Sequence, residues 1–84
     1  MTYTYTPKGV CSRKIQVELE NGVIVQVRFS GGCSGNTQGV AALVEGMEAK
    51  EAVRRLKGIR CGLKPTSCPD QLSLALEEAL LQAK

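Results

Sequence analysis

The sequence predicts a small α+β domain in which helices pack on one face of an antiparallel sheet. Two segments of alternating apolar and polar residues, joined by Asn21-Gly22, are typical of a β-hairpin. Apolar residues at helical spacing follow in the second half of the chain. Strands that precede helices in this way predict one layer of each. With 84 residues, 43% of them hydrophobic, the chain is expected to form one domain, residues 1–84, around a thin core.

Three strands are expected in the first third of the chain. Residues 2–6 alternate Thr and Tyr, which favours an extended edge segment. Two further strands are expected over residues 13–20 and 23–29, because Asn21-Gly22 tolerates the positive φ angles of a two-residue hairpin turn. The residues expected to face the core are Ile15, Val17 and Leu19 on the second strand and Val23, Val25, Val27 and Phe29 on the third.

Two helices are expected after the third strand. Asn36 or Thr37 is expected to cap the first helix, and Gly46 is expected to end it. The second helix covers about residues 48–57, and Gly58 is a natural stop because its φ angle can be positive. The apolar stripes consist of Val40, Leu43, Val44 and Met47 in the first helix and Ala49, Ala52, Val53 and Leu56 in the second.

The last helix has the clearest signals. Thr66, Ser67 and Pro69 are start signals, and the Asp70 carboxylate in the first turn suits the positive end of the helix dipole. We expect Asp70 to support this turn through its exposed backbone amides and not to act as a catalytic acid. The apolar stripe of this helix consists of Leu72, Ala75, Leu76, Ala79 and Leu80.

Four cysteines stand at the ends of the expected elements and not within them: Cys11, Cys33, Cys61 and Cys68. Thiols at element ends can converge at one end of a small domain, and clustered thiolates bind zinc or an iron–sulfur cluster, because soft sulfur suits these metals. The alternative for each single cysteine is a small buried apolar residue. The spacing contains no Cys-x-x-Cys pair, so the case for a metal site depends on all four together.

The segment Gly31-Gly32-Cys33-Ser34-Gly35-Asn36 surrounds one cysteine with glycines. Glycines let the backbone turn tightly and present its amides, which can donate hydrogen bonds to a thiolate or a sulfide. A phosphate-binding loop is the weaker interpretation, because the Lys and Ser/Thr end of a P-loop is missing. The expected supporting residues of the site are therefore Gly31, Gly32, Gly35, Asn36 and Asp70.

Several functions are not expected from this composition. The chain has no histidine, which removes His-dependent catalysis. Its net charge of +3 is mild, and the cations around one helix end complement the helix dipole, whereas nucleic-acid binding would need stacking aromatics nearby. No signal peptide or membrane-spanning run is recognised, so we expect a cytoplasmic protein with reduced thiols. The cations are Arg54, Arg55, Lys57, Arg60 and Lys64.

The expected partner is another protein. Chains of this size often need a metal or a partner for extra stability. The thin core and the uncharged Thr-Tyr segment favour self-association as a homodimer, through the sheet edge or an exposed apolar face.

Thr66-Ser67-Cys68-Pro69-Asp70 is the name motif of the TSCPD domain family, and the whole chain resembles the small stand-alone members of that family. The family is also found near the C-terminus of adenosylcobalamin-dependent ribonucleotide reductases. The resemblance therefore implies that the chain would be classified with the ribonucleoside-diphosphate reductases and linked to DNA synthesis. Independent reductase activity is not expected, because its radical chemistry needs a large barrel with nucleotide and cobalamin sites, which 84 residues cannot enclose.

The order of loops, hairpin and helices over residues 8–81 is also similar to that of the U-type (NifU-like) iron–sulfur scaffold proteins, and implies a NifU/SufE-like fold. Arg13 stands where the scaffolds carry an aspartate thought to help cluster release, and Cys61 is extra to the scaffold pattern. A missing carboxylate and a fourth thiolate favour a closed, more permanent site over transient assembly. The ligands that this resemblance implies are Cys11, Cys33 and Cys68.

Three hypotheses follow from the sequence. The first is a binding module that holds zinc or an iron–sulfur cluster and serves an assembly or redox partner. The second is an accessory domain linked to ribonucleotide reductase, without catalysis of its own. The third is a purely structural domain with incidental thiols. The first two are compatible with each other, and the first is the mechanistic expectation.

Overall fold

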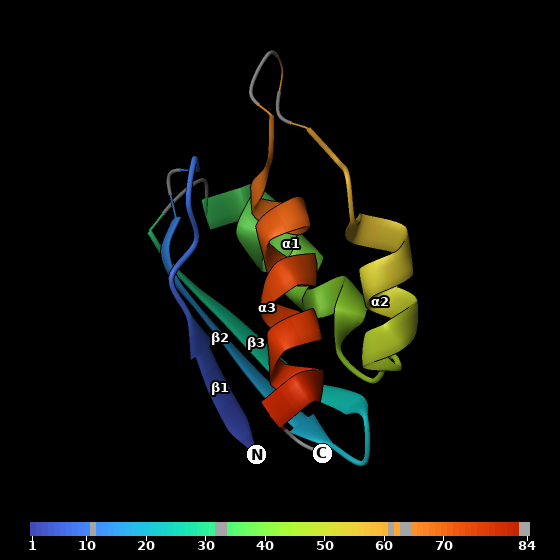
Figure 1. Ribbon diagram of the computed structural model, residues 1–84. Coiled ribbons are helices and arrows are strands. Elements are labelled where there is room, and N and C mark those ends of the chain that lie inside the picture. The colour runs from blue at the N-terminus through green and yellow to red at the C-terminus, as the bar shows by residue number, and fades with distance from the viewer. Residues whose placement is uncertain (11, 32–33, 61, 63–64, 83–84) are drawn as a thin grey trace.

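The computed structural model describes residues 1–10, 12–31, 34–60, 62 and 65–82. The helices lie on one side of a three-stranded sheet (Figure 1), which confirms the predicted α+β fold. Along the chain the elements are β1 (Thr2–Tyr5), β2 (Ser12–Glu20), β3 (Val23–Gly31), α1 (Ser34–Val44), α2 (Ala49–Leu56) and α3 (Cys68–Gln82).

The sheet is antiparallel, with strand order β1-β2-β3. Tyr3 pairs with Val17, which pairs in turn with Val27 on the other side. Asn21 and Gly22, with φ angles of 53° and 79°, form the tight turn between β2 and β3. The predicted hairpin and the predicted edge strand are both confirmed.

A β-bulge changes which residues of β3 face the core. Glu18 pairs with Gln26, but the next residue, Leu19, pairs with Ile24, so Val25 is an extra residue on β3. The bulge reverses the alternation at this point. Ile24 is fully buried and Val25 is 43% exposed. The prediction that Val25 faces the core was therefore wrong, because strict alternation does not hold across a bulge.

Helix α1 begins earlier than predicted and buries a different face. Asn36 and Thr37 lie inside its first turn, which starts at Ser34, so neither is the cap. Leu43 is 77% exposed and was wrongly placed in the apolar stripe. The inward face includes Thr37 and Ala41 and leaves out Leu43. This face consists of Thr37, Val40, Ala41 and Val44.

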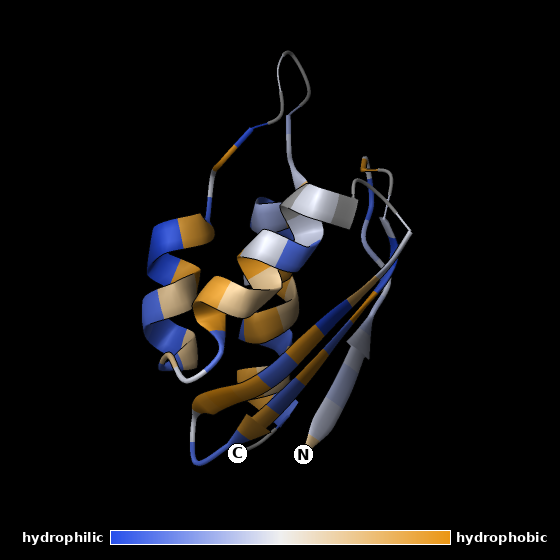
Figure 2. Ribbon diagram, turned by 180° about the vertical axis from the view of Figure 1, so that it is seen from behind, coloured by the Kyte–Doolittle hydropathy of each residue, from blue (hydrophilic) through white to orange (hydrophobic). Residues whose placement is uncertain are grey.

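The other two helices follow the predicted stripes. Helix α2 buries Ala49 and Ala52 and is followed by Gly58 at a φ of 88°, as predicted for a helix stop. Helix α3 packs on β1 and β2, α2 packs on α3, and α1 packs on β3. In Figure 2 hydrophobic and hydrophilic residues alternate along the long strands, as one buried face requires. The fully buried residues of the core are Ile15, Val17, Ile24, Ala49, Ala52, Leu72, Ala75, Leu76 and Ala79.

The connections divide the molecule into two ends. The N-terminus, the last turn of α3 and the β2–β3 hairpin lie at one end. The end of β3, the start of α1 and the described parts of the β1–β2 and α2–α3 connections lie at the other (Figure 1). We call this second end, with the first turn of α3, the loop end. Cys68 is the first residue of α3 and lies at this end.

Candidate functional site

Of the four cysteines, Cys68 is among the described residues, and it begins α3 at the loop end. Its side chain is buried, and its Sγ lies 3.0 Å from Oγ of Ser12. Ser12 begins β2 and pairs with Gly31, the last residue of β3. The start of α3, the start of β2 and the end of β3 therefore meet at one point.

The remaining predicted site residues are placed only in part. Gly31 has a φ of 81°, a backbone conformation that favours glycine, and Gly35 and Asn36 lie in the first turn of α1. Among the described residues, no group of three or more Cys, His, Asp or Glu side chains is arranged to hold a metal ion. The predicted site residues that lie outside the described ranges are Cys11, Gly32, Cys33 and Cys61.

Ser67 fixes the start of α3. Its Oγ accepts a hydrogen bond from the backbone N–H of Asp70 at 3.1 Å, as an N-cap residue does. Its hydroxyl donates to the backbone carbonyl of Ile59 at 2.6 Å, so the same side chain also holds the connection from α2. Pro69 fits the first turn because the N–H that it lacks has no partner within the helix there. The Thr-Ser-Cys-Pro-Asp segment is thus a helix start tied to the preceding connection.

The Asp70 carboxylate has a different role from the predicted one. Oδ1 accepts from the backbone N–H of Gly58 at 2.7 Å, and Oδ2 accepts from the hydroxyl of Thr66 at 2.5 Å. The prediction that Asp70 supports the amides of its own helix turn was wrong, because Ser67 already caps that turn. The carboxylate instead joins the end of α2 to the residues just before α3.

Gln71 is a residue of the loop end that sequence reasoning missed. It is 5% exposed, and its Oε1 accepts from the backbone N–H of Lys8 at 3.0 Å and from the Tyr5 hydroxyl at 3.3 Å. Its Nε2 donates to Thr66 Oγ1 at 2.9 Å. The signal in the sequence was a polar residue on the apolar side of α3, one turn before Ala75.

Three basic residues in the last turn of α2 and just after it form ion pairs on the surface. Arg54 and Arg55 both bond the carboxylate of Glu51, and these hydrogen bonds lower the pKa of Glu51 to about 2. Lys57 pairs with Glu77 of α3 at 3.2 Å. These contacts agree with the interpretation of a solvated helix end.

Two tyrosines join β1 to α3. The hydroxyl of Tyr3 donates to Glu78, and this hydrogen bond to a carboxylate raises the pKa of Tyr3. Burial raises the pKa of Tyr5, whose hydroxyl donates to Gln71. Both groups are therefore neutral at ordinary pH and act as hydrogen-bond donors.

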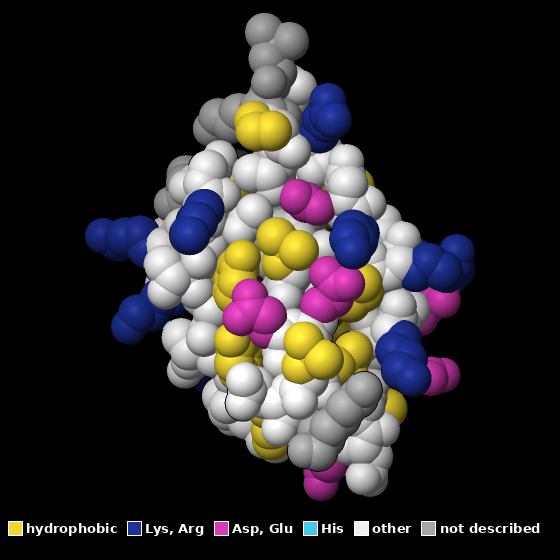
Figure 3. All heavy atoms as spheres, viewed as in Figure 1, with side chains coloured by type: hydrophobic (Ala, Val, Ile, Leu, Met, Phe, Trp, Pro, Cys, Tyr) yellow, Lys and Arg dark blue, Asp and Glu magenta, His cyan; other side chains and the backbone are white. Residues whose placement is uncertain are grey.

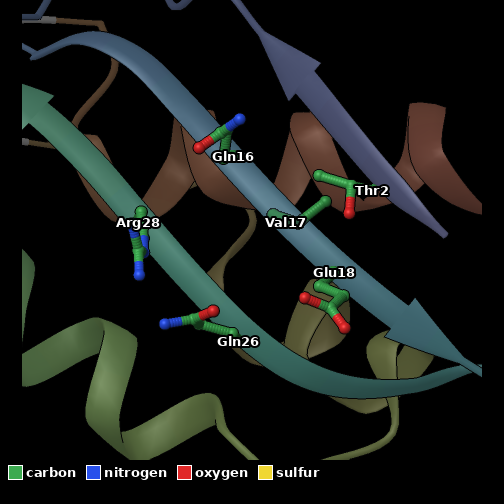
Figure 4. Close-up of a pocket in the computed structure, with 6 residues that line it drawn as sticks. All are labelled: Thr2, Gln16, Val17, Glu18, Gln26 and Arg28. Atoms are coloured by element: carbon green, nitrogen blue, oxygen red, sulfur yellow. The ribbon is translucent and has the colours of Figure 1, made fainter.

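The described residues line several hollows on the surface. Figure 4 shows one of about 110 Å³ on the outer face of the sheet, lined by polar side chains such as Gln16, Glu18 and Arg28. On the face seen in Figure 3, acidic side chains lie among exposed hydrophobic ones, with Lys and Arg around the margin. The charges divide the apolar surface of this face into small areas. None of the described helices is both long and apolar enough to span a bilayer.

Comparison with known proteins gives one match. The model of the family described as the TSCPD domain matches residues 1–80. No curated protein and no solved structure gives a significant match.

Proposed function

This chain belongs to the TSCPD domain family, and on that premise we propose that it is a Cys-rich module that binds zinc or an iron–sulfur cluster at its loop end. The observation that carries the proposal is the contact between the Cys68 thiol and Ser12. Ser12 follows Cys11 in the sequence, and its strand partner Gly31 stands two positions before Cys33. Ser12 and Gly31 are thus close in the sequence to Cys11 and Cys33, and they meet beside Cys68 in the fold.

The chemistry of the donor set fits these groups. Thiolates prefer zinc and iron to magnesium or calcium, and a chain without histidine offers a pure sulfur site. A cytoplasmic location, where thiols stay reduced, suits such a site. Zinc would supply a closed tetrahedral cross-link, and an iron–sulfur cluster would supply an electron-transfer group. The proposed ligands are Cys11, Cys33 and Cys68, with Cys61 as the fourth.

Ser12 has a defined role in this proposal. The short Oγ–Sγ distance is compatible with either atom as the donor when Cys68 carries its proton. A metal-bound thiolate has no proton, so the hydroxyl of Ser12 must then donate to sulfur. Hydrogen bonds of this kind to ligand atoms tune metal sites.

The direct test is metal analysis of protein purified without oxygen, together with its visible absorption spectrum. We expect about one metal site per chain to fill, as zinc or as a coloured iron–sulfur cluster, either on purification or on reconstitution. Aerobic protein should be colourless, because an iron cluster is easily lost. Less than about a tenth of an equivalent of any transition metal, unchanged by reconstitution, would rule out the metal site.

Single Cys→Ser variants sharpen the test. Replacing Cys33 should weaken metal retention more than replacing Cys61, because Cys61 is extra to the scaffold pattern. Both changes replace a thiol with a hydroxyl of nearly the same size, so they form a matched pair. Equal retention in both variants and in wild type would show that neither thiol is a ligand.

Family membership also favours a second function, as an accessory domain of a ribonucleotide reductase. Here the module would bind the reductase and contribute no catalysis of its own. Co-elution of the purified chain with an adenosylcobalamin-dependent reductase at defined stoichiometry is the expected result. Light scattering of the chain alone would show whether it instead pairs with itself as a homodimer.

A further inference from the structure

The buried amide of Gln71 connects two parts of the loop end that are distant in sequence. Its oxygen bonds Lys8 and Tyr5, at the end of β1 and in the connection that leads to β2. Its nitrogen bonds Thr66, just before α3. A residue of α3 thus holds the β1–β2 connection and the helix start in one fixed relation.

The partners allow only one orientation of this amide. The single hydroxyl proton of Thr66 is donated to Asp70, so Thr66 Oγ1 must accept from Gln71. The backbone N–H of Lys8 is a donor and requires the oxygen of Gln71. In a flipped amide, the NH₂ group of Gln71 would face the N–H of Lys8, so two donors would meet. The amide oxygen would face Thr66 Oγ1, whose proton is already donated to Asp70. The network therefore continues without a break from Lys8 through Gln71, Thr66 and Asp70 to Gly58.

Close packing adds to these hydrogen bonds. Gly9 has a φ of 76°, and a Cβ atom at this position would lie 3.1 Å from Cγ2 of Thr66. The β1–β2 connection thus lies directly against the residue that Gln71 bonds. Three residues further on, Ser12 lies against Cys68.

We propose that Gln71 is a positioning residue for the thiol site: it fixes the β1–β2 connection against the start of α3, and so sets the approach of Ser12 to Cys68. The consequence for metal binding rests on the proposed function. The consequence for Cys68 and for Lys8 does not, because both residues are placed by the fold alone.

The test compares Gln71→Met and Gln71→Glu with wild type. Gln71→Met keeps the volume and loses every hydrogen bond of the amide, whereas Gln71→Glu keeps the acceptor for Lys8 and loses the donor to Thr66. Ser73→Ala is the matched control, since Ser73 is a fully buried polar residue of the same helix that bonds only the carbonyl of Asp70.

Three readouts separate positioning from general stability. In Gln71→Met we expect the Lys8 amide to lose hydrogen-exchange protection and Cys68 to be alkylated faster, as located by mass spectrometry. The dissociation constant for Zn²⁺, measured by competition with a chromophoric chelator, should rise by about 10–100-fold. Gln71→Glu should retain protection at Lys8 and still bind Zn²⁺ more weakly, and Ser73→Ala should change none of the three.

The outcomes distinguish this proposal from the proposed function. If wild type binds no Zn²⁺, the proposed function fails, and the first two readouts still decide the role of Gln71. Unchanged exchange at Lys8 and unchanged alkylation of Cys68 in Gln71→Met would overturn the positioning role. Wild-type Zn²⁺ affinity in a Gln71→Met protein whose Lys8 amide is exposed would also overturn it, and would leave the metal site intact.

Discussion

The core and the loop end of this molecule are held together by different forces. In the core, Ile15, Leu72 and Leu76 are fully buried among other aliphatic side chains. At the loop end, Thr66 and Gln71 are also buried, but hydrogen bonds to other side chains and to the backbone fix them. Apolar contacts are strong in sum and not directional, whereas hydrogen bonds are individually modest and strongly directional. Apolar burial in the core therefore contributes most of the stability of the fold. The hydrogen bonds of the loop end fix the positions of its residues relative to one another.

In the part of the chain that the structure describes, every buried side-chain nitrogen and oxygen has a hydrogen-bond partner. Removal of one partner would leave another buried group unsatisfied, at a cost larger than the net value of the bond. Substitutions at the loop end should therefore disturb their neighbours, whereas substitutions in the core should act mainly through volume.

The largest expected effect tests the core. Leu76→Ala removes a fully buried side chain and should lower the free energy of unfolding by about 2–5 kcal/mol, as measured by urea denaturation. Leu81→Ala, on the same helix but 65% exposed, should cost less than about 0.5 kcal/mol. A similar loss in both variants would contradict the division between buried and exposed faces of α3.

The next effect tests the loop end. Asp70→Ala removes the acceptor for Gly58 and Thr66 and should cost about 1.5–3 kcal/mol, because hydrogen bonds to a charged group are among the stronger ones. Asp70→Asn keeps one acceptor and should cost less than about 1 kcal/mol. The matched control is Glu77→Gln, which removes a carboxylate of the same helix that makes only a surface ion pair. Equal stability of Asp70→Ala and this control would contradict the role given to the Asp70 bonds.

Two glycines separate backbone strain from crowding. Gly9 and Gly46 both have positive φ angles, 76° and 84°, but only Gly9 faces a close neighbour. Gly46→Ala should cost about 1 kcal/mol for the left-handed backbone, and Gly9→Ala about 1–2 kcal/mol because Thr66 must also move. Faster alkylation of Cys68 is expected in Gly9→Ala alone. If Gly46→Ala produced the same change at Cys68, the effect would be general loosening and not local crowding.

The sequence was sufficient for most of the fold. Alternation and the Asn21-Gly22 turn predicted the hairpin, and the apolar stripe of α3 was correct, because both depend on burial of one face. The errors lie where a local irregularity shifts that face. The bulge at Val25 and the phase of α1 at Leu43 depend on how the elements pack together. No pattern within either segment could reveal them.

The start of α3 was predictable from the sequence, but the hydrogen bonds around it were not. The sequence identified Cys68 and Asp70 at the start of α3 correctly. The partners of Asp70 could not be predicted, because Gly58 is 12 residues away along the chain and is brought near only by the packing of α2 on α3. Gln71 was missed for the same reason, since its partner Lys8 belongs to a different connection.

The smallest expected effect lies outside both regions, on the exposed surface of α2. Hydrogen bonds from Arg54 and Arg55 lower the pKa of Glu51 from 4.5 to about 2 in the folded state. A lowered pKa stabilises the fold only while the carboxylate is ionised, so this contribution is present above about 4.5 and is lost as the pH falls toward 2. Glu51→Gln should therefore be slightly less stable than wild type near neutral pH.

The difference between Glu51→Gln and wild type should shrink in high salt, because exposed ion pairs are screened. It should also shrink as urea denaturation is repeated at pH values that fall from 4.5 toward 2, because the wild-type carboxylate becomes partly protonated in the folded state. A difference that stayed constant over this pH range would mean that Glu51 acts through packing along α2 and not through its charge. Glu51→Gln should not alter the alkylation rate of Cys68. The hydrogen bonds to the start of α3 involve Gly58 and Ile59, which follow α2, and not this exposed face of the helix.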